Sequence, residues 1–330
     1  MNDRVPNAEP SHCIENYRIA AGQAQGSFYG EVFQDSDLAK WLEAVAYVLS
    51  FQPDPKLEKL ADEAIELVCA AQQPDGYLNT FFTIKEPDQR WRNLREGHEL
   101  YCAGHMMEAA VAYFEATGKR RLLDAMMRLA DLIYNTFGPE EGKIHAYPGH
   151  EEVELALFRM YRATGVRRYL ELSAYFINCR GTGENYFRNE NDRPGYLLYG
   201  ALWTQIPTCP IIKPTSRCGS RNRPPDMLSG MYLYSAMADL AGELKDEGLL
   251  NACKTLWNDV TERQMYVTGG VGASGILERF TTDYDLSNEM AYAESCASIG
   301  LMLFGLRMNR VTRQAQYFDP VERALYNTVL

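Results

Sequence analysis

The sequence has no long apolar run: no window of its 330 residues approaches the roughly 18 uninterrupted apolar residues of a membrane-spanning helix. Its first residues, Met1-Asn-Asp-Arg-Val-Pro6, lack the apolar segment of a secretion signal. None of its eight cysteines forms a Cys-x-x-Cys pair. Scattered cysteines in a chain without a secretion signal indicate reduced thiols. These absences predict a cytoplasmic protein without a membrane partner.

Positive charge is also scarce, since 33 Lys and Arg residues face 44 Asp and Glu residues, for a net charge of -11. A nucleic-acid-binding protein needs a basic face for the phosphate backbone, so we expect no nucleic-acid partner. With 46% hydrophobic and 23% charged residues, the composition is that of a globular protein with one large domain or two ordinary ones.

A helical period dominates the sequence. Leu38, Trp41, Leu42 and Val45 recur at three- and four-residue spacing after Ser36, which is a candidate N-cap. The same pattern predicts helices over 36–50, 56–72, 97–117, 120–136, 150–164, 166–179, 227–243, 247–262, 290–308 and 318–330.

Short breaks separate several of these predicted helices, for example Thr117-Gly-Lys119 and Thr164-Gly-Val166. Such breaks make consecutive helices antiparallel neighbours, which favours either an α-solenoid or a closed α/α toroid. No repeat of fixed period is present, and the Gly-rich and aromatic loops favour the toroid, whose loops collect the chemistry. The stretch 181–226 has few helical periods and ends in a basic, Pro-terminated loop over 215–226.

Four of the five histidines fall between positions 98 and 150. His98 and His105 are seven residues apart and therefore share one helix face, with Glu99 and Glu108 nearby. This is not the four-residue spacing of the zinc proteases, so a structural role remains open beside a functional one. His150 follows a Pro-Gly turn and precedes a predicted helix start, where its side chain can point into a cleft.

A Gly-rich stretch over 266–275 places Gly270, Gly272 and Gly275 at the spacing of a dinucleotide-binding fingerprint. No helix period follows and no strand–helix–strand unit surrounds it, so nucleotide binding is not expected. We interpret the stretch as a loop that positions Glu278, which stands between apolar Leu277 and Phe280. A carboxyl group in apolar surroundings can serve as a general acid, although a surface glutamate fits the local sequence as well.

Glu294 and Cys296 bring a carboxylate and a thiol two residues apart, and both are zinc ligands. Two positions apart in a regular helix point about 200° away from each other, so joint ligation needs a helix start or an irregular turn. The pair is half of a site at most, and the string Glu-x-Cys is common in proteins without any metal.

Several strings, in this order and spacing, resemble glycoside hydrolase family 127 over residues 10–330. They are Glu15-Asn-Tyr-Arg18, Phe33-Gln-Asp-Ser-Asp37, Lys40-Trp-Leu-Glu-Ala44, Ala71-Gln-Gln-Pro-Asp-Gly-Tyr-Leu-Asn-Thr80, His98-Glu-Leu-Tyr-Cys-Ala-Gly-His105, Tyr147-Pro-Gly-His150, Thr268-Gly-Gly270 and Ala291-Tyr-Ala-Glu-Ser-Cys-Ala297.

The resemblance implies an all-α fold, an incomplete (α/α)6 barrel of paired antiparallel helices that occupies 1–330 as a partial catalytic domain. It also implies a retaining β-L-arabinofuranosidase acting on a carbohydrate substrate. By the match, Glu278 is the acid/base, and Glu294 and Cys296 are two of four zinc ligands. His98, His150 and Glu322 match sugar-hydroxyl contacts. Zinc suits this chemistry because it keeps a thiol deprotonated near neutral pH.

The sequence departs from the family pattern in two places. The family's other zinc ligands, an adjacent cysteine pair that includes the nucleophile, come further along than Leu330, as do its β-sandwich domains. Residues 225–230 stand where the family has Gly-His-Ala-Val-Arg, so Asp226 replaces a sugar-contacting histidine. We interpret that segment as a locally compensated frameshift, which sequencing of the gene tests.

Two other functions stay open. One is a catalytically inactive remnant of such an enzyme. The other is a different α/α-toroid sugar enzyme, of the unsaturated glucuronyl hydrolase or sugar epimerase type, which needs acid/base residues and no zinc. If barrel helices are missing, we expect apolar faces to be exposed and the chain to self-associate or form homo-oligomers.

Overall fold

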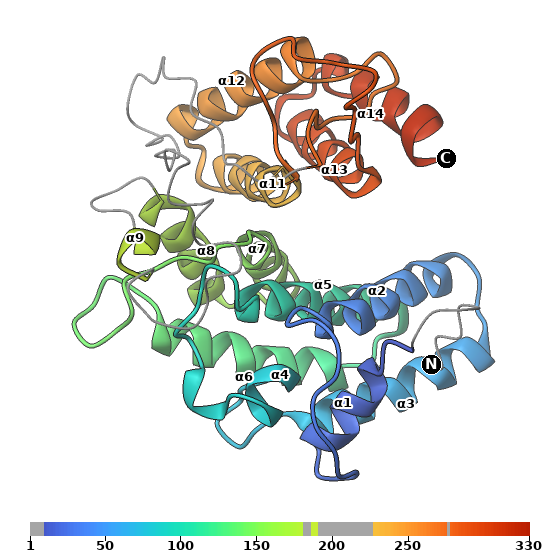
Figure 1. Ribbon diagram of the computed structural model, residues 1–330, viewed down its shortest axis with the longest axis vertical. Coiled ribbons are helices and arrows are strands. Elements are labelled where there is room, and N and C mark those ends of the chain that lie inside the picture. Colours follow the sequence, from blue (N-terminus) through green and yellow to red (C-terminus); the bar gives the residue numbers. More distant parts are fainter. Residues whose placement is uncertain (1–9, 181–185, 191–226, 276–277) are drawn as a thin grey trace. The chain divides into compact units, whose positions relative to one another are not determined.

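Helices carry the regular structure of the chain, described here from a computed structural model that covers residues 10–180, 186–190, 227–275 and 278–330 (Figure 1). Within these ranges no strand forms, and only isolated bridges such as Met265–Val271 occur. The prediction of an all-α fold is therefore confirmed. The helices are α1 (Cys13–Ala20), α2 (Asp35–Phe51), α3 (Pro55–Ala71), α4 (Thr80–Ile84), α5 (Glu99–Thr117), α6 (Arg121–Thr136), α7 (Val153–Thr164), α8 (Arg167–Cys179), α9 (Tyr186–Glu190), α11 (Met227–Leu244), α12 (Glu247–Arg263), α13 (Ser295–Thr312) and α14 (Asp319–Ala324).

Contacts divide the chain into two compact units, Met1–Leu172 and Ser173–Leu330. Unit 1 contains α1 to α7, and unit 2 contains α11 to α14. Each unit has a hydrophobic core of its own. The prediction of one partial barrel domain over 1–330 stays a prediction.

Local sequence explains where several helices begin and end. Asp54 accepts hydrogen bonds from the first backbone N–H groups of α3, and Pro55 follows at a position whose N–H is not needed. Gly118 and Gly165 end α5 and α7 in the left-handed conformation that glycine adopts at little cost. The proposed cap Ser36 is wrong: α2 begins at Asp35, and Ser36 lies buried within its first turn.

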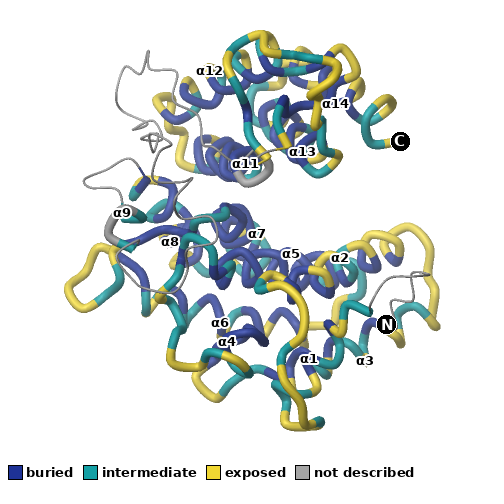
Figure 2. The backbone as a smooth tube through the Cα atoms, in the orientation of Figure 1, coloured by how far each residue is buried: buried dark blue, intermediate teal, exposed yellow. Residues whose placement is uncertain are grey.

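Unit 1 is built around α5, which packs against α2, α6 and α7. Every residue of α5 from Glu99 to Tyr113 is buried, as the dark tube of this helix shows (Figure 2). A helix enclosed on all sides must pair its polar side chains internally. Glu99 accordingly accepts hydrogen bonds from the Tyr77 hydroxyl at 2.5 Å and from the Trp91 backbone N–H at 2.8 Å.

Unit 2 is built around α11, which packs against α12 and α13. Ring contacts between Trp257, Phe304 and Tyr317 join α12 and α13 to the turn before α14, with centroids 5.3 to 5.5 Å apart. A half-buried ion pair ties α13 to α11, because Arg307 Nε lies 2.7 Å from Asp239 Oδ2. Unit 2 thus holds α13, which begins next to Glu294, by both packing and charge.

Apolar side chains remain exposed on one helix of unit 2. Ile299 and Leu306, seven residues apart on α13, are 40% and 42% exposed. Self-association through such faces stays a prediction. Among the described residues, no helix combines the length and the apolar character that crossing a membrane would need. The predicted basic loop and Asp226 lie outside the described residues.

Candidate active site

Two histidine rings stack on each other in unit 1. The centroids of His98 and His150 are 3.9 Å apart and the ring planes are inclined by 23°. His98 precedes α5 in a left-handed conformation, with φ of 53°, so its ring projects from the helix start rather than along the helix side. Its Nδ1 lies 2.6 Å from the carbonyl oxygen of Glu96. Because a carbonyl can only accept, Nδ1 carries a proton, and in the neutral ring Nε2 is the acceptor.

The loop before His150 is held against the segment before His98. Gly149 N–H donates to Leu94 O at 2.8 Å. A Cβ atom at Gly149 would lie 2.5 Å from Arg95 Cα and closer still to the Arg95 carbonyl oxygen. Only glycine allows this approach of two backbones, and the approach places His150 beside His98.

Replacing Gly149 with alanine should therefore separate the two segments. We expect the free energy of unfolding to fall by about 1–3 kcal/mol, the usual cost of forcing an atom into a packed region, and the His98–His150 stacking to be lost. Urea unfolding and histidine NMR spectra measure the two effects. Gly26→Ala is the matched control, since the added atom would meet only the flexible end of Ile19. Equal stability of the two variants would contradict the prediction.

Aromatic and basic side chains surround the stacked histidines. The exposed ring of Phe33 and the His98 ring have centroids 5.3 Å apart. The ring of Tyr101 on α5 lies edge-on to the His98 ring, with centroids 5.6 Å apart. Lys40 on α2 donates to the Tyr101 hydroxyl at 3.1 Å. The sequence did not single out Phe33, Tyr101 or Lys40 as site residues. They could have been found, because each of them lies in one of the sequence strings that resemble the family.

The other predicted residues gather in unit 2. The Tyr292 hydroxyl donates to Glu278 Oε1 at 3.0 Å, and this hydrogen bond is the main reason that the pKa of Tyr292 is raised to about 12. Glu294 and Cys296 also act electrostatically on Tyr292. The structure thus brings Glu278 together with Glu294 and Cys296. Glu278 itself is exposed, so the apolar surroundings predicted for it are not observed among the described residues.

Glu294 and Cys296 occupy a helix start, the arrangement that joint ligation requires. Glu294 is the N-cap of α13, with extended backbone, and Cys296 lies in the first turn. Burial of the Cys296 thiol, followed by its hydrogen bond to the Glu294 carboxylate, raises the pKa of Cys296 to about 12. Without a cation, the thiol therefore stays protonated beside the carboxylate.

The chemistry of this pair fits half of a zinc site. A carboxylate oxygen and a sulfur that face each other at a helix start can bind one ion, and a divalent cation would reverse the rise in thiol pKa. Over the described ranges, no group of three or more His, Cys, Asp or Glu side chains is arranged to hold a metal.

The Gly-rich loop positions this cluster by packing against protein atoms. A Cβ atom at Gly269 would lie 2.5 Å from Ala324 N on α14, and one at Gly275 would lie 3.0 Å from the Tyr292 ring. The carbonyl of Gly272 accepts from Ala293 N–H at 2.9 Å. The glycines thus allow the close approach of α14 and of the segment before α13.

Glu322 lies on α14, the helix that this loop contacts, and its side chain is exposed. Thr328, just after α14, donates to the Thr268 carbonyl oxygen at 3.2 Å and ties the two segments together. The predicted site residues therefore fall into two groups. His98 and His150 belong to unit 1, and Glu278, Glu294, Cys296 and Glu322 belong to unit 2.

Comparison with known proteins places the chain among the glycoside hydrolases. Residues 1–330 match the family model of the β-L-arabinofuranosidase, GH127 catalytic domain. The chain is 37% identical over 349 residues to the non-reducing end β-L-arabinofuranosidase of Bifidobacterium longum subsp. longum, which covers 99% of this chain and 52% of that protein. It therefore belongs to the GH127 β-L-arabinofuranosidase family.

Solved structures agree with this family. The chain matches a GH127 β-L-arabinofuranosidase from Geobacillus stearothermophilus T6 with a TM-score of 0.91 and 54% identity, over 99% of this chain and 51% of that one. It spans about half the length of both of these enzymes.

A cellobiose 2-epimerase from Bacillus thermoamylovorans B4167 matches with a TM-score of 0.53, over 95% of this chain and 86% of that chain. Its 10% identity shows a shared fold alone, which agrees with the predicted α/α-toroid class.

Proposed function

We propose that the chain forms part of a retaining glycosidase that removes terminal β-L-arabinofuranosyl residues from carbohydrates, with Glu278 as its acid/base. The observation that carries this proposal is the cluster of Glu278, Tyr292, Glu294 and Cys296 at the start of α13. Two relatives of the chain are named β-L-arabinofuranosidases, which supports the choice of sugar.

Glu278 is exposed and can reach a glycosidic oxygen, and its Oε1 already accepts one hydrogen bond. In a retaining reaction it gives a proton to the departing oxygen and later removes one from water. His98, His150 and Glu322 contact sugar hydroxyls in this proposal. The Nδ1 proton of His98 is donated to the Glu96 carbonyl oxygen, so in a neutral His98 ring Nε2 is the nitrogen that accepts hydrogen bonds, and in this proposal it accepts one from a sugar hydroxyl.

Glu294 and Cys296 would hold zinc together with the adjacent cysteine pair that the family resemblance implies beyond Leu330. Bound zinc would supply a thiolate at neutral pH, the nucleophile that retention requires. In this chain, Glu294 orients the Cys296 sulfur by their hydrogen bond, and Tyr292 orients Glu278.

Hydrolysis of a chromogenic β-L-arabinofuranoside tests the proposal. The longest product of the gene, with the cysteine pair, is compared with the 330-residue chain, and the metal content of both is measured. We expect zinc and activity in the longer product. If neither protein cleaves the substrate while both fold, the inactive-remnant alternative is supported instead.

Metal binding gives a separate prediction. In the longer gene product, Cys296→Ser should weaken zinc binding by more than the roughly 10–100-fold that follows loss of an outer-shell partner. Competition with a chromophoric chelator measures the affinity, and Cd²⁺ adds a thiolate absorption band as a direct sign of sulfur ligation. Cys179→Ser, at another half-buried thiol, is the control. Unchanged zinc affinity in Cys296→Ser would remove Cys296 from the ligand set.

A further inference from the structure

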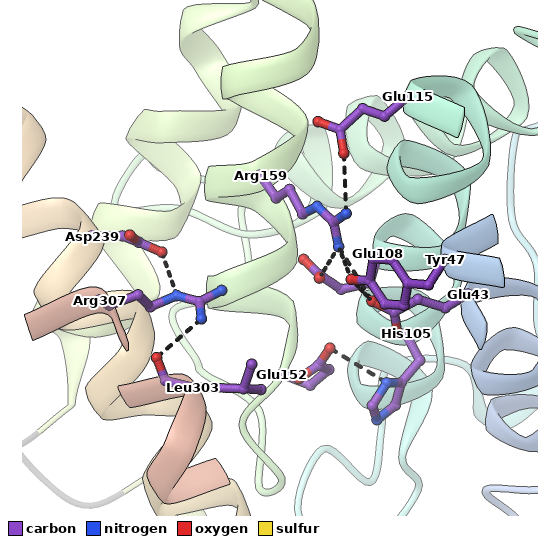
Figure 3. Close-up of polar contacts among 10 residues, drawn as sticks. All are labelled: Glu43, Tyr47, His105, Glu108, Glu115, Glu152, Arg159, Asp239, Leu303 and Arg307. Atoms are coloured by element: carbon purple, nitrogen blue, oxygen red, sulfur yellow. Dashed lines mark hydrogen bonds and ion pairs between the residues drawn. The ribbon is translucent and has the colours of Figure 1, made fainter. Parts of the chain in front are cut away.

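A buried carboxyl group and a buried imidazole meet at the start of α7. Glu152 is 2% exposed and His105 is 4% exposed, and Glu152 Oε1 lies 3.4 Å from His105 Nδ1 (Figure 3). Glu152 is the residue just before α7, and His105 lies in the second turn of α5. His150 precedes Glu152 by two residues, so this contact lies beside the stacked histidines.

Packing leaves Glu152 little freedom. A Cβ atom at Gly104 of α5 would lie 2.7 Å from Glu152 Cγ and 2.9 Å from the Val153 nitrogen. The start of α7 therefore rests directly on the backbone of α5. The family-like string that ends in Gly104-His105 has this physical basis: the glycine admits α7, and the histidine contacts the residue at its start.

Tyr101 links the buried pair to the stacked histidines. Its ring is edge-on to His105 at 4.5 Å, to His98 at 5.6 Å and to His150 at 6.2 Å. Glu152, His105, Tyr101 and His98 thus form a continuous line of packed side chains. A shift of Glu152 would act on His150 both through this line and through the short backbone between them.

We propose that Glu152 and His105 are a positioning pair that fixes His150 against His98. This inference rests on the proposed function, in which these two histidines contact the sugar. Glu152 and His105 are positioning residues and do not touch the substrate themselves. The pair thereby sets how well the enzyme binds its sugar rather than how fast bonds break.

Burial shifts the pKa values of both groups toward their neutral forms. Burial raises the pKa of Glu152 well above its usual value, and Glu108 on α5 and Glu43 on α2 raise it further. Glu154 on α7 adds to the rise, while Lys40 on α2 opposes it. Burial, and then Lys40, lower the pKa of His105 well below its usual value.

Neutrality gives the pair a direction of pH dependence. Glu152 Oε2 is buried and has no hydrogen-bond partner, so an ionised Glu152 would be a poorly compensated anion. Because the folded-state pKa is raised, the stability that the protonated group contributes is present below the unfolded pKa. It is lost as the pH rises toward the folded pKa. Alkaline pH should therefore loosen the start of α7 and His150.

The test uses the 330-residue chain with isotope-labelled histidine. Its five histidines give few NMR signals, and those of His98 and His150 report the stacking. Glu152→Ala should move both sets of signals toward solvent-exposed values, whereas Glu152→Gln, which keeps a neutral polar group of the same shape, should preserve them. Glu115→Gln, at an exposed carboxylate on α5, is the control and should leave the His98 and His150 signals unchanged.

Unchanged His98 and His150 signals in a folded Glu152→Ala protein would overturn the proposal. If that variant does not fold, an alkaline titration decides instead. The signals of the wild type should move as the pH rises, and those of Glu152→Gln should not. Identical behaviour of the two proteins would also overturn the inference.

A kinetic measurement on the longer gene product separates positioning from general destabilisation. Glu152→Ala should raise KM for the arabinofuranoside several-fold with little change in kcat, and Glu152→Gln should restore KM. A fall in kcat with unchanged KM would contradict the positioning role. Absence of any cleavage by the wild type would count against the proposed function alone, because the NMR result needs no substrate.

Discussion

Replacing Arg159 with methionine should lower the free energy of unfolding by about 3–5 kcal/mol, because it removes a guanidinium that pairs with three carboxylates. Arg159 Nη1 lies 2.6 Å from Glu108 Oε2 and 3.2 Å from Glu43 Oε1, and Nη2 lies 3.2 Å from Glu115 Oε2 (Figure 3). Glu108 is 6% exposed, and its second oxygen, Oε1, has no hydrogen-bond partner. Without the guanidinium, Glu108 would be a buried charge that has lost its ion-pair partner.

Urea unfolding measures this loss, and pH gives it a signature. Burial and the charge of Glu108 already raise the pKa of Glu43 in the wild type. Arg159 opposes this rise, so the pKa of Glu43 should be higher still in Arg159→Met, and the deficit of the variant should shrink as the pH falls and Glu43 takes up a proton. Adding Glu108→Gln to Arg159→Met should recover part of the stability, and the double-mutant cycle gives the coupling between the two side chains.

Arg168→Met is the matched control for this prediction. Arg168 pairs with Asp131 at 2.7 Å, but both side chains are about two-fifths exposed. An ion pair in contact with water contributes less than about 1 kcal/mol. If Arg159→Met and Arg168→Met lose the same free energy of unfolding, the Arg159 ion pairs contribute no more to stability than a surface ion pair, and the prediction is wrong.

The second large effect is expected at Glu278. In the longer gene product, Glu278→Gln should lower kcat for a β-L-arabinofuranoside with a poor leaving group by about 10²–10⁴-fold, the usual contribution of a general acid/base. Glutamine keeps the size of the side chain and can still accept the Tyr292 hydrogen bond. The loss would therefore come from the missing proton donor rather than from a shift of the loop.

Two comparisons make this result specific. A nitrophenyl arabinofuranoside has a leaving group that needs little protonation, so Glu278→Gln should slow the glycosylation step of this substrate much less. Glu289→Gln, at an exposed glutamate of the loop before α13, should leave kcat unchanged. An equal loss for both substrates would assign Glu278 a role other than proton donation.

Periodicity was sufficient to predict most of the helices. The predicted ranges 120–136, 227–243 and 247–262 differ from α6, α11 and α12 by one residue at one end. The sequence missed the short helices α1, α4 and α9, and α4 depends on a tertiary contact. In α4, Thr80 donates twice to buried Asp35, from its backbone N–H at 2.7 Å and from its hydroxyl at 2.6 Å. A partner 45 residues away leaves no local period.

The start of α13 shows why apolar periodicity does not predict helix boundaries reliably. The apolar period predicted a helix from 290, but α13 begins at Ser295. Ala293 has a positive φ of 41°, and its N–H donates to Gly272 instead of to a helical carbonyl. The Gly-rich loop therefore overrides the local preference, and this is what frees Glu294 from the helix and lets it face Cys296.

The site could be predicted residue by residue but not in its geometry. The resemblance supplied His98 and His150, and their spacing of 52 residues gave no sign that the rings would stack. Their contact depends on Gly149 and on the approach of two loops. Similarly, Glu152 and Glu151 are equivalent in sequence, and only the packing of α7 on Gly104 distinguishes the residue that reaches His105.

The enclosure of α5 has a consequence for how unit 1 acquires its structure. A helix whose first 15 residues are all buried has almost no side that suits water, so α5 should not persist alone in solution. Its neighbours α2, α6 and α7 in turn bury their apolar faces against it. Each of these helices is therefore stabilised only when the others are present, and unit 1 should fold and unfold in one cooperative step. The backbone amides of α5 should be among the slowest to exchange their hydrogens with water.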